Sequence, residues 1–264
     1  MHNFNYHRPS SVADAVKAIS AASDGKILAG GHTLLPTMKQ GLAAPSDLVD
    51  ITAIAELKGI KMDGNNLVIG AATPHAEVAK SSVVKGAIPA LAVLAEGIGD
   101  AAVRNRGTIG GSISNNDPAA DYPAGLVGLG ATVHTNKRKI AADDFFKGLF
   151  ETALEAGEIV TAVSFPKPEK AGYAKFPNPA SRYAMVGVFV AKTGGGVRVA
   201  VTGAGACVFR SKDLEQALSG KWSADAAGGV KVASKGLNND IHGTADYRAH
   251  LVTVMAKRAV AAAG

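Results

Sequence analysis

Two glycine pairs, set far apart along the chain, constrain this sequence more than any other feature. The first lies in Ala29-Gly30-Gly31-His32-Thr33 and the second in Thr108-Ile109-Gly110-Gly111-Ser112. The first pair follows a short apolar strand predicted over 26–29 and opens a brief helix, and a second strand is predicted over 47–51. This order of strand, glycine turn, helix and strand indicates a small α/β unit at the start of the chain.

Glycine pairs of this kind suit a loop that holds a diphosphate. A dinucleotide diphosphate needs several N–H donors, and side chains between backbone and phosphate would block their approach. Each hydrogen bond to a charged group contributes roughly 1.5–3 kcal/mol, so a handful of amides can hold a cofactor without a lysine. A helix that begins after Thr33 adds a favourable dipole. We expect the two pairs to converge and present amides to one diphosphate, although each pair alone also fits an ordinary turn.

Neither pair belongs to a common nucleotide-binding motif. The Gly-Lys-Ser/Thr end of a Walker A loop is missing, and neither pair is part of GxGxxG. The segment GAGACV at 203–208 begins like GxGxxG after a strand, but it lacks the third glycine and a suitably placed acidic residue. A P-loop and a Rossmann fold are therefore not expected.

The predicted elements group into three stretches, 1–56, 57–168 and 169–264. The first holds a helix capped by Ser10 or Ser11 and the α/β unit described above. The second is predicted to hold a hairpin across 63–66, helices near 87–96 and 124–129, strands near 131–135, 138–141 and 159–165, and a polar, glycine-rich interruption over 97–123. The third is predicted to hold a hairpin of 184–192 and 197–203 and then two helices, the last over about 244–262.

Charge and composition narrow the possible functions. The formal charge is +6 with a pI near 9.3, but the basic residues are scattered, and the nearest basic run is Lys137-Arg138-Lys139. A nucleic-acid-binding module would need a basic face with interleaved aromatic residues, which the sequence lacks, so no nucleic acid partner is expected. An anionic cofactor or an acidic partner subunit would suit the charge.

The single cysteine, Cys207, has two consequences. It cannot form a disulfide within the chain, which favours a reducing compartment, and it cannot supply four thiolates for a [2Fe–2S] cluster. The seven histidines are dispersed without ligand spacing, so no metal site is expected. No apolar run approaches the roughly 18 residues of a membrane helix, and no secretory signal is visible. We therefore expect a cytoplasmic chain without a transmembrane segment.

Four longer segments resemble one known family. AGGHTLLPTMKQG at 29–41, IGDAAVRNRGTIGGSISNNDPAADYPA at 98–124, KFPNPASRYAMVGVFVA at 175–191 and DIHGTADYRAHLVTVMAKRAV at 240–260 are similar to the medium, FAD-binding subunit of the carbon monoxide dehydrogenase and xanthine dehydrogenase family of molybdenum hydroxylases. The segment at 98–124 is the most specific, because it fixes many residue types over a long contiguous stretch. The resemblance spans nearly the whole chain.

The resemblance implies an α+β fold. This would be the two-subdomain FAD-binding fold of the vanillyl-alcohol oxidase and MurB type, followed by a C-terminal α/β domain with a sheet and helices. The FAD-binding subdomains would be 1–56 and 57–168, and the C-terminal domain 169–264. FAD would lie in the cleft between the subdomains and the C-terminal domain, with both glycine loops around its diphosphate.

The family also implies further contacts to the cofactor. Asp121 would accept hydrogen bonds from the ribose or ribityl hydroxyls, although a helix N-cap ahead of Pro123 would explain this aspartate equally well. Val160, or its neighbour Ile159, would pack on the flavin ring, or serve only as a buried strand residue. Lys175 would lie near the polar edge of the flavin and stabilise negative charge on the reduced ring, or be a solvated surface lysine.

Four more positions complete the expected site. Tyr183 would cover the isoalloxazine near its reactive face, and His32 would offer its backbone rather than its imidazole. Arg104 and Arg106 would pair with phosphate or with a neighbouring subunit, or remain exposed. The cofactor-binding residues expected from the sequence are Ala29, Gly30, Gly31, His32, Thr33, Leu34, Thr108, Ile109, Gly110, Gly111, Ser112, Asp121, Val160, Lys175 and Tyr183.

By this resemblance the chain would be an oxidoreductase subunit that relays electrons. A large subunit with a molybdopterin centre would hydroxylate the substrate, and electrons would pass through a [2Fe–2S] small subunit to FAD on this chain and on to an external acceptor, in a dimer of heterotrimers. Because the cofactor would do the chemistry, no catalytic residue is expected. One alternative is a self-standing FAD-dependent oxidoreductase that acts directly on a small molecule, and another is a scaffold that has lost FAD.

Overall fold

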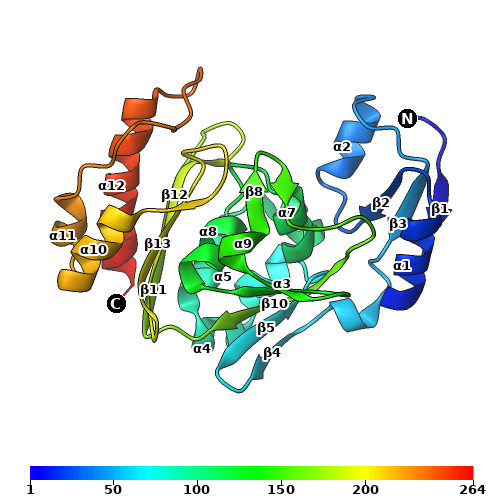
Figure 1. Ribbon diagram of the computed structural model, residues 1–264, viewed down its shortest axis with the longest axis horizontal. Helices are drawn as coiled ribbons and strands as arrows, with labels where there is room; N and C mark the ends of the chain where they lie inside the picture. The colour runs from blue at the N-terminus through cyan, green and yellow to red at the C-terminus, as the bar shows by residue number, and fades with distance from the viewer. Residues whose placement is uncertain (264) are drawn as a thin grey trace.

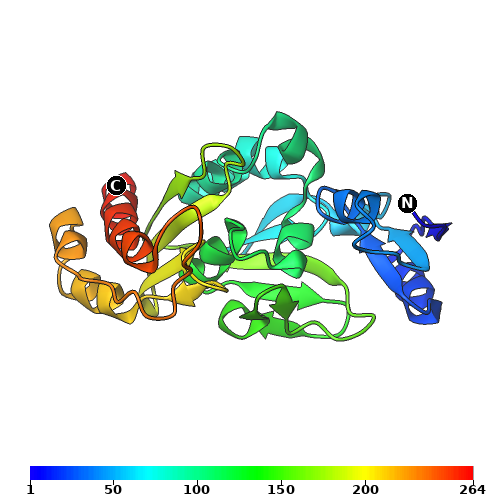
Figure 2. The same ribbon diagram turned by 90° about the horizontal axis from the view of Figure 1, so that it is seen from above.

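Three main β-sheets succeed one another along the chain and lie in a row across the molecule (Figure 1). The computed structural model describes residues 1–263. The N-terminal sheet lies at one end of the row, the C-terminal sheet and its helices lie at the other, and a five-stranded sheet lies between them, as Figure 2 also shows from above. No helix among residues 1–263 is both long and apolar enough to cross a membrane.

The first sheet is parallel and small. Its elements are β1 (Asn5–His7), α1 (Val12–Ala21), β2 (Gly25–Leu28), α2 (Leu34–Lys39), β3 (Asp47–Asp50) and the 3₁₀ helix η1 (Ala55–Leu57). The strand order is β1-β3-β2, so β3 has a partner on both sides, and it is buried along its whole length. Ser11 caps α1, because its side chain accepts a hydrogen bond from Asp14 N. Ala15 of α1 packs with Val49 of β3 in the core of this unit.

The second sheet has five antiparallel strands in the order β4-β5-β10-β6-β7. A separate two-stranded ribbon, β8 with β9, lies beside it. The elements of this unit are β4 (Ile60–Asp63), β5 (Asn66–Gly70), α3 (His75–Lys80), α4 (Ser82–Ala87), α5 (Pro89–Glu96), α6 (Ala101–Arg106), α7 (Ile109–Asn115), α8 (Tyr122–Leu129), β6 (Thr132–Thr135), β7 (Lys139–Ala141), α9 (Ala142–Phe145), β8 (Phe146–Gly148), β9 (Glu151–Thr152) and β10 (Val160–Pro166).

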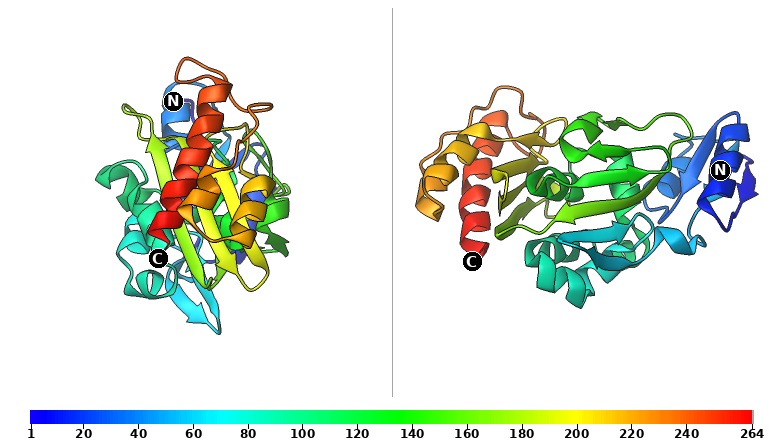
Figure 3. Two further views of the ribbon diagram at one scale, coloured as in Figure 1. Left: turned by 90° about the vertical axis from the view of Figure 1, so that its left-hand side faces the viewer. Right: turned by 60° about the horizontal axis from the view of Figure 1, so that its bottom comes forward.

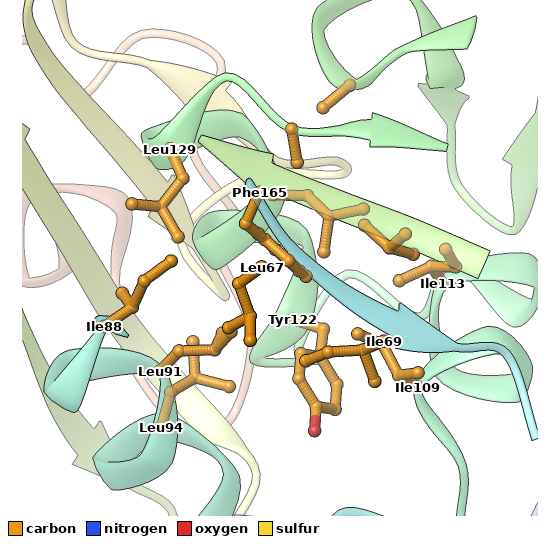
Figure 4. Packing of buried hydrophobic residues seen from close by; sticks show 14 of the residues in the cluster. Leu67, Ile69, Ile88, Leu91, Leu94, Ile109, Ile113, Tyr122, Leu129 and Phe165 are labelled. Carbon is orange, nitrogen blue, oxygen red and sulfur yellow. The ribbon is translucent and has the colours of Figure 1, made fainter. Parts of the chain in front are cut away.

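The core of the second unit anchors the segments that form the site. Figure 4 shows side chains from β5, α5, α7, α8 and β10 packed together. Leu67, Leu91, Ile109, Tyr122 and Phe165 are all fully buried there. Fully burying such an apolar side chain stabilises the fold by roughly 1.5–3 kcal/mol. Because α7 contributes Ile109 to this core, the start of α7 has a fixed position.

The third sheet is antiparallel, and helices cover both of its faces. Its elements are β11 (Lys170–Pro177), β12 (Ala184–Thr193), β13 (Gly196–Thr202), β14 (Phe209–Arg210), α10 (Lys212–Gly220), α11 (Ala224–Gly228) and α12 (Ala245–Ala262), with the strands in numerical order. α12 lies across β11 and β12, as the left view of Figure 3 shows. A Cβ on Gly172 would overlap the carbonyl oxygen of Ala259, so the glycine permits this close approach. α8 packs on the other face through Phe189 of β12, which explains why β12 is buried over eight successive residues.

Most predicted elements are confirmed, and the main difference lies in segment 97–123. The hairpins across 63–66 and 193–196, the strand near 159–165 and the helix over about 244–262 are all found. The segment predicted as an irregular interruption instead contains α6 and α7. Asp100 and Thr108 cap these helices, since their side chains accept hydrogen bonds from Val103 N and Gly111 N. Helices of six and seven residues contain too few turns to show a clear apolar period.

Candidate cofactor site

A cavity of about 590 Å³ opens between the first and second units. Its size lies within the roughly 300–1,000 Å³ range of small-molecule sites. Its wall contains the first glycine loop (29–33), most of the second glycine loop (108–112), parts of segments 98–103 and 154–160, and the turn 181–183. Residues from all three stretches of the sequence therefore meet at one cavity.

The two glycine loops converge, as the sequence predicts. A Cβ on Gly30 would lie 2.7 Å from the Cα of Gly107 and would overlap the carbonyl oxygen of Arg106. Glycine is required at this position because the backbones of the two segments are in direct contact. A Cβ on Gly111 would lie 3.9 Å from the Cβ of Ala29, so the loops also approach one another at the cavity wall.

The first glycine loop presents unbonded amides. Gly31 has a φ of +73°, which a side chain would strain, and it turns the chain into α2. Within residues 1–263, the backbone N–H groups of 30–34 donate no hydrogen bond, and Thr33 does not cap α2 through its side chain. Backbone N–H groups without partners beside a cavity are suited to bind an anion.

The second glycine loop differs from this expectation, because it uses its amides internally. Ile109 N donates to Thr73 O at 3.3 Å, Gly110 N donates to Ala71 O at 2.9 Å, and Gly111 N donates to the Thr108 hydroxyl at 3.1 Å. The first two bonds accompany an antiparallel bridge between Pro74 and Thr108, which attaches the loop to the segment that follows β5, and the third is the N-cap bond of α7. The second loop therefore forms part of the cavity wall, but its amides at 109–111 are not free to donate hydrogen bonds to a ligand.

The two glycines of the second loop have different surroundings. A Cβ on Gly110 would lie 2.7 Å from the Cβ of Ala71, so the glycine lets the start of α7 pack closely against the residue that follows β5. A Cβ on Gly111 would meet the Thr108 hydroxyl at 3.0 Å and otherwise only Ala29 at 3.9 Å. The missing side chain of Gly111 therefore leaves space in the cavity wall. Ile109, in contrast, points into the core and is not part of the wall.

Asp121 is buried in the cavity wall and belongs to an ion pair. Its Oδ1 lies 2.9 Å from Lys175 Nζ and accepts a hydrogen bond from the Tyr173 hydroxyl at 2.5 Å. Burial raises the pKa of Asp121, and Lys175 opposes part of that rise. Asp121 also occupies the N-cap position of α8, but its side chain makes no capping hydrogen bond.

Lys175 lies behind the wall rather than in it. Its Nζ also donates to Gly97 O at 2.7 Å, and it is absent from the residues that line the cavity. It is not a solvated lysine, because only 10% of its side chain is exposed. Lys175 thus connects β11 to Asp121 and to the segment that follows α5.

The remaining expected residues lie around the cavity. Val160 and Ile159 both line it and are also buried in the cores of the second and first units. Tyr183 lies at the mouth with 49% of its surface exposed. Arg104 donates to Ile98 O at 3.0 Å, which fixes the chain turn there.

Sequence reasoning missed several wall residues. The cavity is also lined by Lys26, His75, Ile98, Gly99, Leu154 and Glu158. Their placement depends on contacts between distant segments, such as the Pro74–Thr108 bridge, and a single sequence carries no signal for those contacts. No group of three or more histidine, cysteine or acidic side chains within residues 1–263 is arranged to hold a metal ion.

Glu158 fixes the segment that closes one side of the cavity. Its carboxylate accepts hydrogen bonds from Arg138 Nε and Nη2, both at 3.0 Å, and from the Thr135 hydroxyl at 2.7 Å. The bonds to Arg138 make the largest contribution to lowering the pKa of Glu158, which falls to about 2. Glu158 is therefore ionised at neutral pH, and it holds 154–160 against the turn between β6 and β7.

Comparison with known proteins decides the family. Residues 2–168 match the family described as the FAD binding domain in molybdopterin dehydrogenase. The chain belongs to this family. It is 36% identical to the carbon monoxide dehydrogenase medium chain of Hydrogenophaga pseudoflava, with 98% of this chain and 96% of that one covered.

Other relatives of this FAD-binding family agree over the same length. The nicotine 6-hydroxylase medium subunit of Paenarthrobacter nicotinovorans is 34% identical, with 98% and 96% of the two chains covered. The solved structure of reconstituted CO dehydrogenase from Oligotropha carboxidovorans superposes with a TM-score of 0.91 at 33% identity, covering 99% of this chain and 97% of that one. The mixed helix-and-sheet fold is therefore that of a carbon monoxide dehydrogenase medium chain.

The cavity fits the dinucleotide that the family name specifies. The unbonded N–H groups of 30–34 can donate hydrogen bonds to a diphosphate, and the absence of a side chain on Gly111 leaves room for it. The apolar side chains of Ile98, Leu154 and Ile159 provide a surface for a flat ring system. Donors at one part of the wall suit the diphosphate at the centre of FAD, and apolar surface at another part suits one of the aromatic ring systems at its ends.

Proposed function

We propose that this chain binds FAD in the cavity and carries electrons as the flavin subunit of a multi-subunit molybdenum hydroxylase. The observation that carries the proposal is the meeting of the two glycine loops, where five successive amides without hydrogen-bond partners line the same cavity as Gly111. Because the chain belongs to an FAD-binding family, we propose FAD as the ligand of these amides.

The fold supports a division of the chain into three parts. We assign 1–56 and 57–168 to the two subdomains of an FAD-binding fold of the vanillyl-alcohol oxidase and MurB type, and 169–264 to a C-terminal α/β domain. In support, each stretch contains one main sheet, and the family match ends at residue 168. The first and second sheets pack in two different hydrophobic cores, and the third sheet has one face in a core of its own and the other, through Tyr173 and Phe189, in the core of the second unit.

The partners in the proposal are a molybdopterin-binding large subunit and a [2Fe–2S] small subunit, arranged as a dimer of heterotrimers. Two relatives named medium chain and medium subunit, of carbon monoxide dehydrogenase and nicotine 6-hydroxylase, support such an assembly. Electrons would arrive from the iron–sulfur clusters of the small subunit and leave to an external acceptor. The cytoplasmic location expected from the sequence stays a prediction.

In this proposal FAD supplies the redox chemistry, and the side chains of this chain position it. The first glycine loop binds the diphosphate through its amides. Asp121 is oriented by its contact with Lys175 through Oδ1 and offers its second carboxylate oxygen to cofactor hydroxyls. Tyr183, at the mouth, covers the ring from solvent. Apolar side chains of Ile159 and Val160 exclude water from the opposite part of the wall.

Purification of the full-length chain from its native host tests the proposal. We expect flavin to co-purify, together with two further chains, molybdenum and iron. Absorbance spectroscopy should show flavin bleaching when substrate is given to the assembly but not to the flavin chain alone. A chain that takes up no FAD in either preparation would contradict the proposal. Substrate-dependent bleaching by the isolated chain would instead support the self-standing flavoenzyme.

A further inference from the structure

A buried histidine at the cavity wall has no role in the binding site described so far. His75 begins α3 and lines the cavity, yet only 4% of its surface is exposed. Its Nδ1 is enclosed and has no hydrogen-bond partner among residues 1–263. Buried polar side-chain atoms are nearly always bonded, so an unbonded imidazole beside a cavity requires an explanation.

His75 lies directly behind the point where the two glycine loops meet. Its backbone N–H donates to Gly107 O at 2.9 Å, which ties α3 to the start of the second loop. A Cβ on Gly107 would lie 2.7 Å from His75 Nε2, so the Nε2 edge of the ring faces Gly107. Gly107 in turn contacts Gly30 of the first loop. Gly107 is therefore the residue between the Nε2 edge of the imidazole and Gly30 of the first loop.

The orientation of the imidazole is fixed by its neighbours. The ring of Tyr122 packs against it, with ring centroids 5.3 Å apart and an interplanar angle of 48°. Tyr122 is itself fully buried in the core that Figure 4 shows. His75 is consequently held in place before any ligand arrives, as a binding residue should be.

The imidazole is neutral and can act as a donor. Burial, with smaller contributions from His32 and Arg104, lowers the pKa of His75 to about 4. A neutral imidazole carries one N–H, on either nitrogen. The enclosed Nδ1 has no acceptor, so a proton there would leave a buried donor unbonded. The tautomer with its proton on Nε2 leaves Nδ1 as an unbonded acceptor instead, and it places the N–H on the edge that faces Gly107, where a ligand in the cavity can accept it.

We propose that His75 is a further cofactor-binding residue, which donates a hydrogen bond from Nε2 to the diphosphate of the dinucleotide held by the first glycine loop. The inference rests on the proposed function, because it requires a dinucleotide in this cavity. It also accounts for the second loop, whose amides at 109–111 are already bonded. His75 supplies a donor beside the segment whose own backbone has none to spare.

A matched pair of substitutions tests this role. Gln at position 75 keeps an N–H donor near the place of Nε2, whereas Leu has similar size and no donor. The full-length chain, purified with any chains that accompany it and stripped of flavin, is titrated with FAD while flavin fluorescence is followed. We expect His75→Leu to raise the Kd about ten- to hundredfold, the effect of losing one hydrogen bond to a charged group, and His75→Gln to stay within a few-fold of the parent chain.

Two further measurements separate this role from a structural one. Thermal unfolding of the FAD-free variants reports any loss of packing, and Phe165→Leu, in the same core as Tyr122 but away from the cavity wall, serves as a control that should lower stability and leave the Kd unchanged. Equal Kd values for the Gln and Leu variants, whether both normal or both weakened, would overturn the role of His75. A parent chain that binds no FAD would instead overturn the proposed function itself.

Discussion

Individual glycines around the cavity are required for different physical reasons. Gly30 permits contact between two backbones, Gly31 adopts a positive φ, and Gly110 allows α7 to pack on Ala71. Gly111 alone borders open space. In the sequence these residues form two identical pairs, so their separate roles could not be predicted without the structure.

Gly111→Val should abolish flavin retention while the fold survives. The branched side chain would project into the space left for the diphosphate. The fold should survive, because valine has a higher helix propensity than glycine and the added Cβ would crowd only the Thr108 hydroxyl, at 3.0 Å. Bound flavin is measured by absorbance after gel filtration, and folding by thermal unfolding. Gly86→Val is the matched control, because Gly86 lies in α4 with nothing within 4 Å of its added Cβ. Normal flavin content in Gly111→Val would remove Gly111 from the site.

The ion pair of Asp121 with Lys175 leads to a prediction about pH. Lys175→Met leaves a buried carboxylate without its cation, which should lower the free energy of unfolding by about 3 kcal/mol at pH 7. Burial already raises the pKa of Asp121, and loss of the cation raises it further. A carboxyl group whose pKa is higher in the folded than in the unfolded state stabilises the folded protein at pH values below the unfolded pKa, which is about 3.9. This contribution is lost as the pH rises through the folded pKa. The deficit should therefore shrink as pH falls from 7 towards 4.

Urea unfolding at pH 7, 5.5 and 4 measures this deficit. Lys192→Met is the control, because Lys192 pairs with Glu169 on the same sheet but both side chains are about half exposed. Such a surface pair contributes roughly 0–1 kcal/mol, so the control should change little at any pH. A Lys175→Met deficit that is the same at every pH would show that the carboxylate does not cause it.

At the scale of elements, the cavity wall depends on contacts between segments that are distant in sequence. The turn between β6 and β7 holds segment 154–160 through Arg138 and Glu158. Asn136 adds a two-way contact, since its side chain accepts from Ile159 N and its backbone N–H donates to Ile159 O. These contacts keep the two apolar wall residues Ile159 and Val160 in position.

Glu158→Gln should weaken this attachment in a pH-dependent way. Arg138 lowers the pKa of Glu158 from 4.5 to about 2, so the ionised carboxylate contributes stability above the unfolded pKa. That contribution is lost as pH falls through the folded value. We expect the free energy of unfolding of Glu158→Gln to be lower than that of the parent chain by about 1–2 kcal/mol at pH 7. This is less than the full pKa shift would give, because Arg138 is partly exposed to solvent. The difference should disappear as the pH falls from 4.5 to 2.

Denaturant unfolding across this pH range provides the measurement. Glu155→Gln is a close control, because Glu155 also contacts Arg138 but 59% of its side chain is exposed. It should have little effect at any pH. A Glu158→Gln deficit that persisted undiminished below pH 2.5 would argue for lost packing rather than lost charge.

Sequence patterns predicted the long elements better than the short ones. β12, β13 and α12 are long enough for their composition and turns to identify them. β1, β8 and β9 have only two or three residues, and α3 and α6 have six, so local periodicity cannot reveal them. The convergence of the glycine loops was predicted, but the internal bonding of the second loop depends on the Pro74–Thr108 bridge and was not.

At the scale of the whole molecule, the C-terminal sheet reaches the cavity through the turn between β11 and β12. Residues 181–183 of this turn line the cavity mouth. Asn178 connects the turn to the loop before α12, since its side-chain nitrogen lies 3.3 Å from His242 Nδ1. The position of Tyr183 over the cavity therefore depends on how firmly that loop is held.

One buried arginine holds the loop before α12. Arg248 is 4% exposed and donates to Met185 O at 2.7 Å and to Gly203 O at 3.1 Å. Its Nη2 also donates to both carboxylate oxygens of Asp240, at 2.9 and 2.8 Å. A single guanidinium thus joins α12, the ends of two strands of the third sheet, and the loop that contacts the turn at Asn178.

Arg248→Met should loosen the C-terminal unit and, through it, the mouth of the cavity. The substitution removes one donor from two carbonyl groups and, within residues 1–263, the only cation from the carboxylate of Asp240, so we expect the free energy of unfolding to fall by about 2–4 kcal/mol. Hydrogen exchange should accelerate in 236–243 and at the start of β12, while β5 and β10 keep their protection, because these strands pack in a different core. FAD affinity should fall only severalfold, since the glycine loops do not touch Arg248.

Arg258→Met, at an exposed position on the same helix, should change none of these quantities. Loss of protection in β5 and β10 to the same degree would show instead that the three units unfold as one.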